Sequence, residues 1–287
     1  QMGRTSIVIG RGNEGASNGH TGGILQENQT ETIQFSISDY TPSLSIQLWK
    51  NYWDEFTITL STPVNASISI PQIPGAWRFS LGENDIYIYN GEPVPYSPFQ
   101  EIYIDLIPRN SYLTSGIWTI QLIPQNLRNG LWDMWMPASA VRSSATGFLL
   151  PTPNTTLTIP STSSRAISVG AYDSNLNIPA AFSGRGFTWN NQFIKPEIVA
   201  PGVDITSCAP GGGYETRTGT SMATPFVTGS AALLMQWGIV NGNDLYLYGD
   251  KLKAYLINGA KPLSEFTEFP NPQIGWGTLC VADAIPR

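Results

Sequence analysis

Short alternating runs of apolar and polar residues fill the central part of the chain. Ile102, Ile104 and Leu106 are one example, and the same two-residue period recurs several times between positions 33 and 122. Turn signals such as Asn90-Gly91 and Arg109-Asn110 separate the runs. A two-residue period is typical of half-buried β-strands, and many short strands at this spacing indicate an antiparallel β-sandwich or jelly roll.

The flanking parts of the chain follow different patterns. Thr5 to Gly10 is a short β-branched run, which favours a buried parallel strand. From position 223 to 235, apolar residues recur every three or four positions, which predicts a helix with one apolar face. Asp250 precedes a second helical pattern over 251–258, and Gly259 ends it. These patterns predict an α/β region on both sides of the β-rich block.

Composition excludes several classes of protein. The 287 residues include 41% hydrophobic and 13% charged residues, which argues for a packed core and against disorder. The net charge of −6 argues against nucleic acid as a partner. No apolar run reaches the roughly 20 residues that a membrane span needs. Two cysteines, Cys208 and Cys280, cannot form a disulfide framework, and two free thiols are expected.

Two polar residues occupy positions that are suited to catalysis. Ser221 lies at the predicted start of the apolar helix, where backbone N–H groups are unpaired and the helix dipole favours negative charge. Acyl transfer needs such donors because an oxyanion forms beside the attacking oxygen. The alternative is an N-capping serine. Asn13 follows the first strand between Gly12 and Gly15, and the alternative there is an ordinary turn asparagine.

The segment Gly219-Thr220-Ser221-Met222-Ala223-Thr224-Pro225 closely resembles the nucleophile motif of subtilisin-like serine proteases, and Asn13-Glu14-Gly15 resembles their oxyanion-hole segment. Blocks at 166–173, 181–186, 195–202 and 274–279 extend the resemblance over about residues 1–25 and 146–287. It implies a parallel-sheet α/β core and a polypeptide substrate. Calcium sites are common in this family, but Asp173, Asp204, Asp244 and Asp250 form no ligand-spaced loop, so we expect no metal ion and no cofactor.

The resemblance also assigns roles to residues. It implies that Ser221 is the nucleophile, and that the Asn13 amide and the Ser221 backbone N–H bind the oxyanion. Gly10, Arg11 and Gly12 would edge the substrate pocket, with the Arg11 side chain expected to face solvent. Serine proteases of this type also need an aspartate and a histidine.

The β-rich block interrupts the resemblance. Asn13 and Ile167 are 154 positions apart, whereas a short connection joins the corresponding elements in plain subtilases. We therefore expect residues 26–145 to form an inserted jelly-roll domain, between core segments 1–25 and 146–287. An insertion at this place resembles the branch of the clostridial Csp germination proteases, and a secreted or spore-associated bacterial protein is favoured.

His20 is the only histidine of the chain. It lies in a Gly/Ser/Asn-rich stretch, whereas subtilases carry their catalytic histidine near a helix start in a His-Gly-Thr-type motif. A surface histidine in a flexible loop is therefore expected. Because subtilases place aspartate and histidine ahead of the serine, we expect this chain to be the C-terminal part of a longer protease. The N-terminal part, as a separate associated chain, would supply both residues.

Two other functions remain open at this point. A pseudoprotease would keep the subtilase scaffold without the aspartate or the histidine, and would act by binding a partner. A glycan- or protein-binding module would be based on the inserted block, which holds six of the nine tryptophans: Trp49, Trp53, Trp77, Trp118, Trp132 and Trp135. Core packing is the favoured explanation for these tryptophans.

Overall fold

The computed structural model describes residues 5–189 and 193–285, and the chain divides into two compact units. Unit 1 comprises residues 1–16 and 153–287, and unit 2 comprises residues 17–152. The sequence predicts boundaries at 25/26 and 145/146, so the inserted unit is longer than expected at both ends. The reason is that β2 (His20–Ile24) and β12 (Gly147–Phe148) both pair with strands of unit 2.

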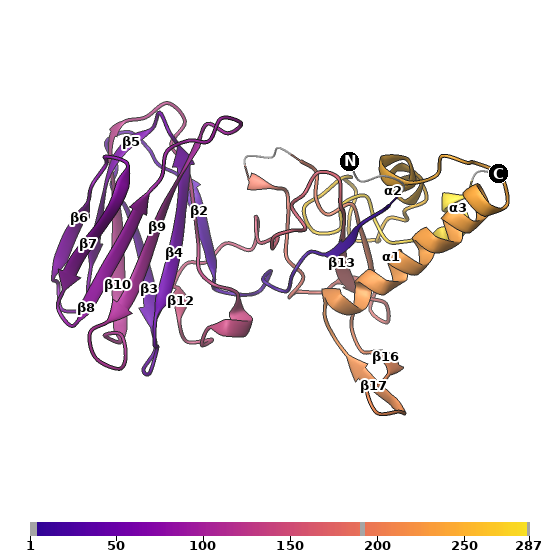
Figure 1. Cartoon of the computed structure of the whole chain (residues 1–287), viewed down its shortest axis with the longest axis horizontal. Coiled ribbons are helices and arrows are strands. Elements are labelled where there is room, and N and C mark those ends of the chain that lie inside the picture. The colour runs from indigo at the N-terminus through magenta and orange to yellow at the C-terminus, as the bar shows by residue number, and fades with distance from the viewer. Residues whose placement is uncertain (1–4, 190–192, 286–287) are drawn as a thin grey trace. The chain divides into compact units, whose positions relative to one another are not determined.

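Unit 2 is a sandwich of two antiparallel sheets (Figure 1). The larger sheet contains, in spatial order, β2 (His20–Ile24), β11 (Leu131–Trp135), β4 (Leu44–Asn51), β9 (Phe99–Pro108), β8 (Asn84–Asn90) and β7 (Gly75–Leu81). The smaller sheet contains β12 (Gly147–Phe148), β3 (Glu31–Ile37), β10 (Gly116–Asn126), β5 (Glu55–Ser61) and β6 (Ser67–Ile70). A 3-10 turn, η1 (Ser139–Val141), precedes β12.

The predicted alternation sets the core of unit 2. In β3, Phe35 points inward and lies opposite Trp118 of β10 in the strand register. The two rings stack with centroids 6.2 Å apart, and the Trp118 indole N–H donates to the carbonyl of Thr114 at 2.9 Å. Trp118 is fully buried, whereas Trp53 and Trp77 are exposed, so the tryptophans divide between core and surface.

His20 does not lie at the surface, and the prediction of a surface histidine in a flexible loop is wrong. It begins β2, opposite Trp135 of β11, and is only 3% exposed. Its Nε2 lies 2.7 Å from Oδ1 of Asp133, and its Nδ1 lies 2.9 Å from Oγ1 of Thr152. The two glycines that follow His20 allow close packing of β2 on β11, because a Cβ on Gly22 would lie 2.3 Å from the Asp133 carboxylate.

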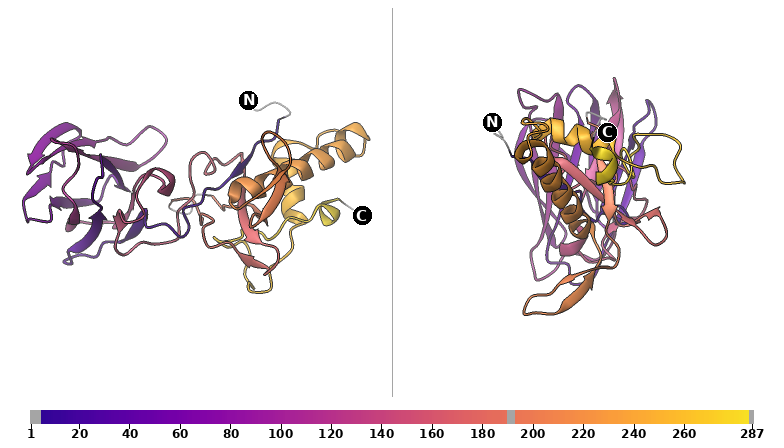
Figure 2. Two further views of the ribbon diagram at one scale, coloured as in Figure 1. Left: turned by 90° about the horizontal axis from the view of Figure 1, so that it is seen from below. Right: turned by 90° about the vertical axis from the view of Figure 1, so that its right-hand side faces the viewer.

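Unit 1 is built on a short parallel sheet. β1 (Val8–Gly10) and β15 (Ile198–Pro201) flank β13 (Ile167–Asp173), and β14 (Ile178–Pro179) pairs antiparallel with the end of β13. A separate hairpin, β16 (Ile205–Cys208) and β17 (Tyr214–Arg217), projects from this unit beside the first turn of α1 (Figure 2). The helices are α1 (Thr220–Met235), its π-helical continuation η3 (Gln236–Val240), α2 (Gly249–Asn258) and α3 (Val281–Ala284).

Helix α1 packs on β1, β13 and β15 through small and apolar side chains. Its buried residues are Thr220, Ala223, Val227, Ser230, Ala231 and Leu234, which repeat at the predicted three- and four-residue spacing. Phe226, predicted on the same face, is instead 42% exposed. α1 and η3 together are long and apolar enough to cross a membrane. This is weak evidence for a membrane span, because the core helix of a globular domain passes the same test.

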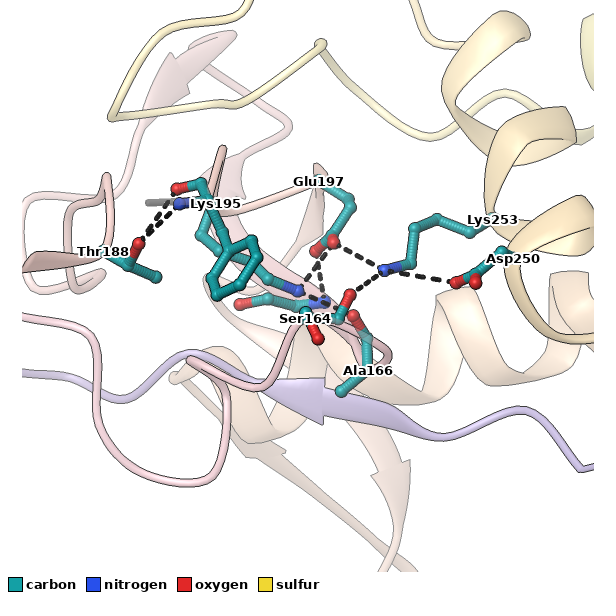
Figure 3. A network of polar contacts seen from close by, with 9 residues as sticks. Ser164, Ala166, Thr188, Lys195, Glu197, Asp250 and Lys253 are labelled. Carbon is teal, nitrogen blue, oxygen red and sulfur yellow. Dashed lines mark hydrogen bonds and ion pairs between the residues drawn. The ribbon is translucent and has the colours of Figure 1, made fainter. Parts of the chain in front are cut away.

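A buried ionic network joins the sheet to α2 (Figure 3). The Glu197 carboxylate accepts from the backbone N–H of Ser168 at 2.7 Å and from Nζ of Lys195 at 2.6 Å. Lys253 of α2 reaches the same carboxylate at 3.0 Å. Burial lowers the pKa of Lys195, and the negative charge of Glu197 opposes that shift. The network fixes the start of β13 against β15 and so holds the sheet on which α1 rests.

Candidate active site at the start of helix α1

Ser221 is the second residue of α1 and is exposed. The helix is capped at Gly219, and no side chain makes a capping hydrogen bond there, so Ser221 does not act as an N-cap. The first N–H groups of a helix have no partner within the helix. The Ser221 N–H follows this general pattern and donates no hydrogen bond within the described residues. A hydroxyl and a free N–H therefore stand side by side at the positive end of the helix.

Asn13 lies directly beside this helix start. Its side-chain oxygen accepts from the backbone N–H of Thr220 at 3.0 Å and from the Thr220 hydroxyl at 3.0 Å. A backbone N–H can only donate, so the atom that faces it must be the amide oxygen. The Asn13 NH₂ group is consequently turned away from Thr220 and keeps its donors for another acceptor. The structure thus brings Asn13 to Thr220, the residue next to Ser221, across 207 positions of sequence.

Two glycines permit this approach. A Cβ on Gly10 would lie 2.9 Å from Oγ1 of Thr224, so only glycine lets β1 run this close to the first turn of α1. Gly219 has a φ of +154°, a conformation that side chains disfavour, and a Cβ there would lie 3.3 Å from Nδ2 of Asn13. Asn13 follows β1 by three residues, and its position is therefore set by the contact between β1 and α1.

Arg11 is buried, and the prediction that its side chain faces solvent is wrong. The side chain is 1% exposed and donates from Nε to Oγ of Ser183 at 2.9 Å. It fits because Gly170 has no side chain; a Cβ on Gly170 would lie 2.4 Å from the guanidinium carbon. Burial lowers the Arg11 pKa to about 9, and the nearby charge of Arg185 adds to this shift. The guanidinium is therefore part of the interior of unit 1.

The three residues predicted at the edge of a substrate pocket face different neighbours. Gly10 faces α1, and the Arg11 side chain points inward. Gly12, at a φ of +91°, lies against the side chain of Thr158, where a Cβ would be 2.5 Å away. Thr158 also donates its N–H to the Arg11 carbonyl at 3.1 Å. Any contribution of this segment to a substrate pocket would come from its backbone, and the pocket role stays a prediction.

A groove of about 480 Å³ borders Ser221 on the other side. Its walls are the β16–β17 hairpin and the exposed side of the first two turns of α1, including Met222 and Phe226. Glu215 and Arg217 form an ion pair at 2.7 Å along one wall. The sequence did not predict this hairpin, because its strands are short and mostly polar; the glycine-rich stretch 211–213 was the only turn signal.

The start of α1 gathers the exposed Ser221 hydroxyl and the Asn13 amide, and no histidine of this sequence is available to them. Both ring nitrogens of His20, the only histidine of the chain, are engaged by Asp133 and Thr152 within unit 2. Over residues 5–189 and 193–285, no group of three histidine, cysteine or acidic residues is arranged to hold a metal ion. A serine hydroxyl is a weak nucleophile without an adjacent base, so a base from elsewhere would be needed to activate Ser221.

Comparisons with known proteins agree on one family. Residues 143–277 match the sequence profile of the subtilase family. Over 123 residues the chain is 40% identical to bacillopeptidase F of Bacillus subtilis, and over 114 residues it is 39% identical to alkaline elastase YaB of a Bacillus species. These matches cover 42% and 38% of this chain, but only 8% and 25% of the two relatives.

One solved structure is similar over nearly the whole chain. The CspB protease of Clostridium perfringens matches 97% of this chain with a TM-score of 0.90 and 35% sequence identity. The match covers 58% of the CspB chain, so this chain spans less than two thirds of each of these three proteins. The predicted fold class and the predicted resemblance to the Csp branch are confirmed.

Proposed function

We propose that this chain, whose residues 143–277 match the subtilase profile, is the C-terminal part of a serine endopeptidase of that family. It supplies Ser221 as the nucleophile and two donors for the oxyanion, the Asn13 NH₂ group and the Ser221 N–H. The observation that carries this proposal is the orientation of Asn13. Thr220 binds the amide oxygen through two donors, which leaves the NH₂ group free to donate at the start of α1.

The reaction follows from these positions. The Ser221 hydroxyl oxygen attacks the carbonyl carbon of a peptide bond, and a histidine takes the hydroxyl proton. The negative charge that forms on the carbonyl oxygen is stabilised by the Asn13 NH₂ group, the Ser221 N–H and the positive end of α1. When the intermediate collapses, the same histidine protonates the leaving amine. Water then hydrolyses the ester on Ser221 and restores the hydroxyl.

The histidine and its orienting aspartate would come from an N-terminal part of the same protease, present as a separate chain. Exposed apolar side chains on unit 1 support this arrangement. Phe226 and Leu233 of α1 are 42% and 57% exposed, and Phe226 and Met222 line the groove beside Ser221. A partner that covered this side of α1 would bury these residues and bring its histidine toward the hydroxyl of Ser221.

Labelling with a fluorophosphonate tests the proposal, because this reagent modifies only an activated serine. The sample is the complete gene product, with every chain identified by intact mass and N-terminal sequencing. We expect a single adduct on Ser221, no adduct in Ser221→Ala, and an unchanged adduct in Ser207→Ala, a matched serine in the same groove. A folded complete product that gives no Ser221 adduct would refute the proposed protease activity.

A pseudoprotease is the second candidate. It is supported by one observation: both ring nitrogens of His20 already make hydrogen bonds within unit 2. The same sample separates the two functions. If the complete product contains a histidine that approaches Ser221, labelling and peptide cleavage both occur. If it contains none, Ser221 remains unlabelled although the complete product folds, and the subtilase unit would then act by binding.

A further inference from the structure

A cavity of about 380 Å³ opens at one end of the sandwich, and all of its lining residues belong to unit 2. Its walls come from both sheets, because strands β4, β5, β8 and β9 all begin or end there. The turn between β4 and β5 places Tyr52 and Trp53 at its rim, 46% and 42% exposed. Cavities of this size commonly hold small ligands.

Lys50 supplies a cation inside the cavity. The residue is 7% exposed, and its ammonium group donates to the carbonyls of Asn51 at 3.1 Å and Asp54 at 2.6 Å. An ammonium group has three N–H bonds, so one is left without a hydrogen-bond acceptor, and the nitrogen lies 5.3 Å from the centroid of the Phe56 ring. Burial lowers the Lys50 pKa to about 8, although Asp54 and Glu55 oppose the shift. Within the described residues no carboxylate forms an ion pair with Lys50, so its buried charge is only partly compensated.

The Asp54 carboxylate is directed at another part of the chain. It accepts from the backbone N–H groups of Arg128 at 2.7 Å, Asn129 at 3.0 Å and Gly130 at 2.9 Å. These amides stabilise its charge and hold it in the 128–130 turn. The other charged residues that line the cavity are Glu55 and Arg128, both with exposed side chains and of opposite sign. Lys50 and Asp54 are the buried charges of the lining, and the Asp54 carboxylate is already compensated by three backbone N–H groups.

Neutral groups complete the lining. Gln100 donates both hydrogens of its NH₂ group, to Oδ1 of Asn90 at 2.7 Å and to the carbonyl of Gly91 at 3.0 Å. Its Oε1 makes no hydrogen bond to any described residue, and it can accept one from a hydroxyl group. Trp53 at the rim offers an aromatic face for an apolar ring surface. The lining thus combines a cation, a hydroxyl acceptor and an aromatic face.

We propose that this cavity binds an acidic sugar unit, whose carboxylate pairs with Lys50, whose hydroxyl groups meet Gln100, and whose ring lies on Trp53. A carboxylate would supply the acceptor that the third N–H of Lys50 lacks. A charge-assisted hydrogen bond is stronger than a neutral one, so the carboxylate is expected to dominate recognition. The site belongs to unit 2, and its occupancy does not depend on the protease activity proposed above.

The test uses the complete chain with D-glucuronate and D-glucose as probes in isothermal titration calorimetry at low salt. We expect D-glucuronate to bind about tenfold more tightly than D-glucose, as one charge-assisted hydrogen bond implies. Trp53→Ala should weaken binding by roughly two- to tenfold, the range of an aromatic contact. Trp77→Ala, an exposed tryptophan that does not line the cavity, serves as the matched control and should change nothing.

Variants of the charged residues sharpen the test. Lys50→Met should lower D-glucuronate affinity to that of D-glucose. Lys50 also donates to two carbonyls of the 51–54 turn, so this variant can lose binding through misfolding. The affinities of variants at the exposed rim residues therefore provide a second, independent test. Glu55→Gln should tighten D-glucuronate binding and Arg128→Gln should weaken it, each by roughly two- to fivefold, the range of an exposed charge. Absence of saturable D-glucuronate binding, equal binding of D-glucose, or no response to Trp53→Ala would each overturn the proposal.

Discussion

The two units bury their apolar residues to different extents. In unit 2 each sheet covers the inner face of the other, and one continuous core includes side chains from both. In unit 1 the helix α1 covers the parallel sheet, but its own outer side leaves Phe226 and Leu233 exposed. Strand β1 has a partner on only one side within the described residues. An inserted domain can therefore be complete in itself while its host unit still has surfaces suited to a partner.

The largest expected effect is a difference in folding between the two units when each is produced separately. Residues 17–152 alone should fold and melt in one cooperative transition, because their core needs no residue from outside. Residues 1–16 joined by a short flexible linker to 153–287 should bind a hydrophobic dye and melt without a sharp transition. Circular dichroism and dye fluorescence measure both. If the joined unit 1 melts cooperatively and binds no dye, the comparison of the two units fails.

The buried ionic network should matter most for the stability of unit 1. Glu197→Gln leaves Lys195 buried without its carboxylate, and breaking a buried ion pair in this way costs about 3–5 kcal/mol. Glu215→Gln breaks an exposed pair with Arg217 and serves as the control, with a cost of about 0–1 kcal/mol. Denaturant unfolding of the complete product gives both values. Equal costs for the two variants would show that burial of the network contributes nothing.

The catalytic prediction for unit 1 concerns Asn13. In the complete product, Asn13→Ala should lower kcat by about 10²–10³, the loss typical of removing one oxyanion-hole donor. KM should change little, because the oxyanion exists only in the transition state. Asn175→Ala, an exposed asparagine of the same unit, is the matched control. Steady-state cleavage of a peptide substrate gives both constants, and an unchanged kcat would remove Asn13 from the oxyanion site.

The sequence predicted unit 2 well where period-two patterns were long, as in β3, β9 and β10. It failed at His20, because a Gly-rich stretch looks like a loop although glycine is what lets β2 pack on β11. It also failed at Arg11, since nothing local indicates that Gly170, 159 positions later, leaves room for a guanidinium. Both failures arise from contacts distant in sequence, whereas the helix start at Ser221 was readable from its local pattern.

Thr220 is the residue of the site that sequence patterns did not single out, and it gives the smallest predicted effect. Its hydroxyl and its backbone N–H both donate to the Asn13 oxygen. Thr220→Val removes the hydroxyl and keeps the N–H and the shape, so the amide loses one of its two orienting donors. A neutral hydrogen bond contributes about 0.5–1.5 kcal/mol, which corresponds to a kcat about two- to twelvefold lower.

Thr220→Val can also show whether the Thr220 hydroxyl orients the Asn13 amide or only stabilises the helix. If Thr220 acts only by orienting Asn13, its effect requires that amide, and Thr220→Val should change kcat little in an Asn13→Ala background. A double-mutant cycle of the two substitutions measures this coupling. Thr228→Val, an exposed threonine of α1 whose hydroxyl bonds only to the carbonyl of Thr224 within the described residues, is the matched control. Additive effects of Thr220→Val and Asn13→Ala would mean that the hydroxyl acts on the helix and not on the oxyanion donor.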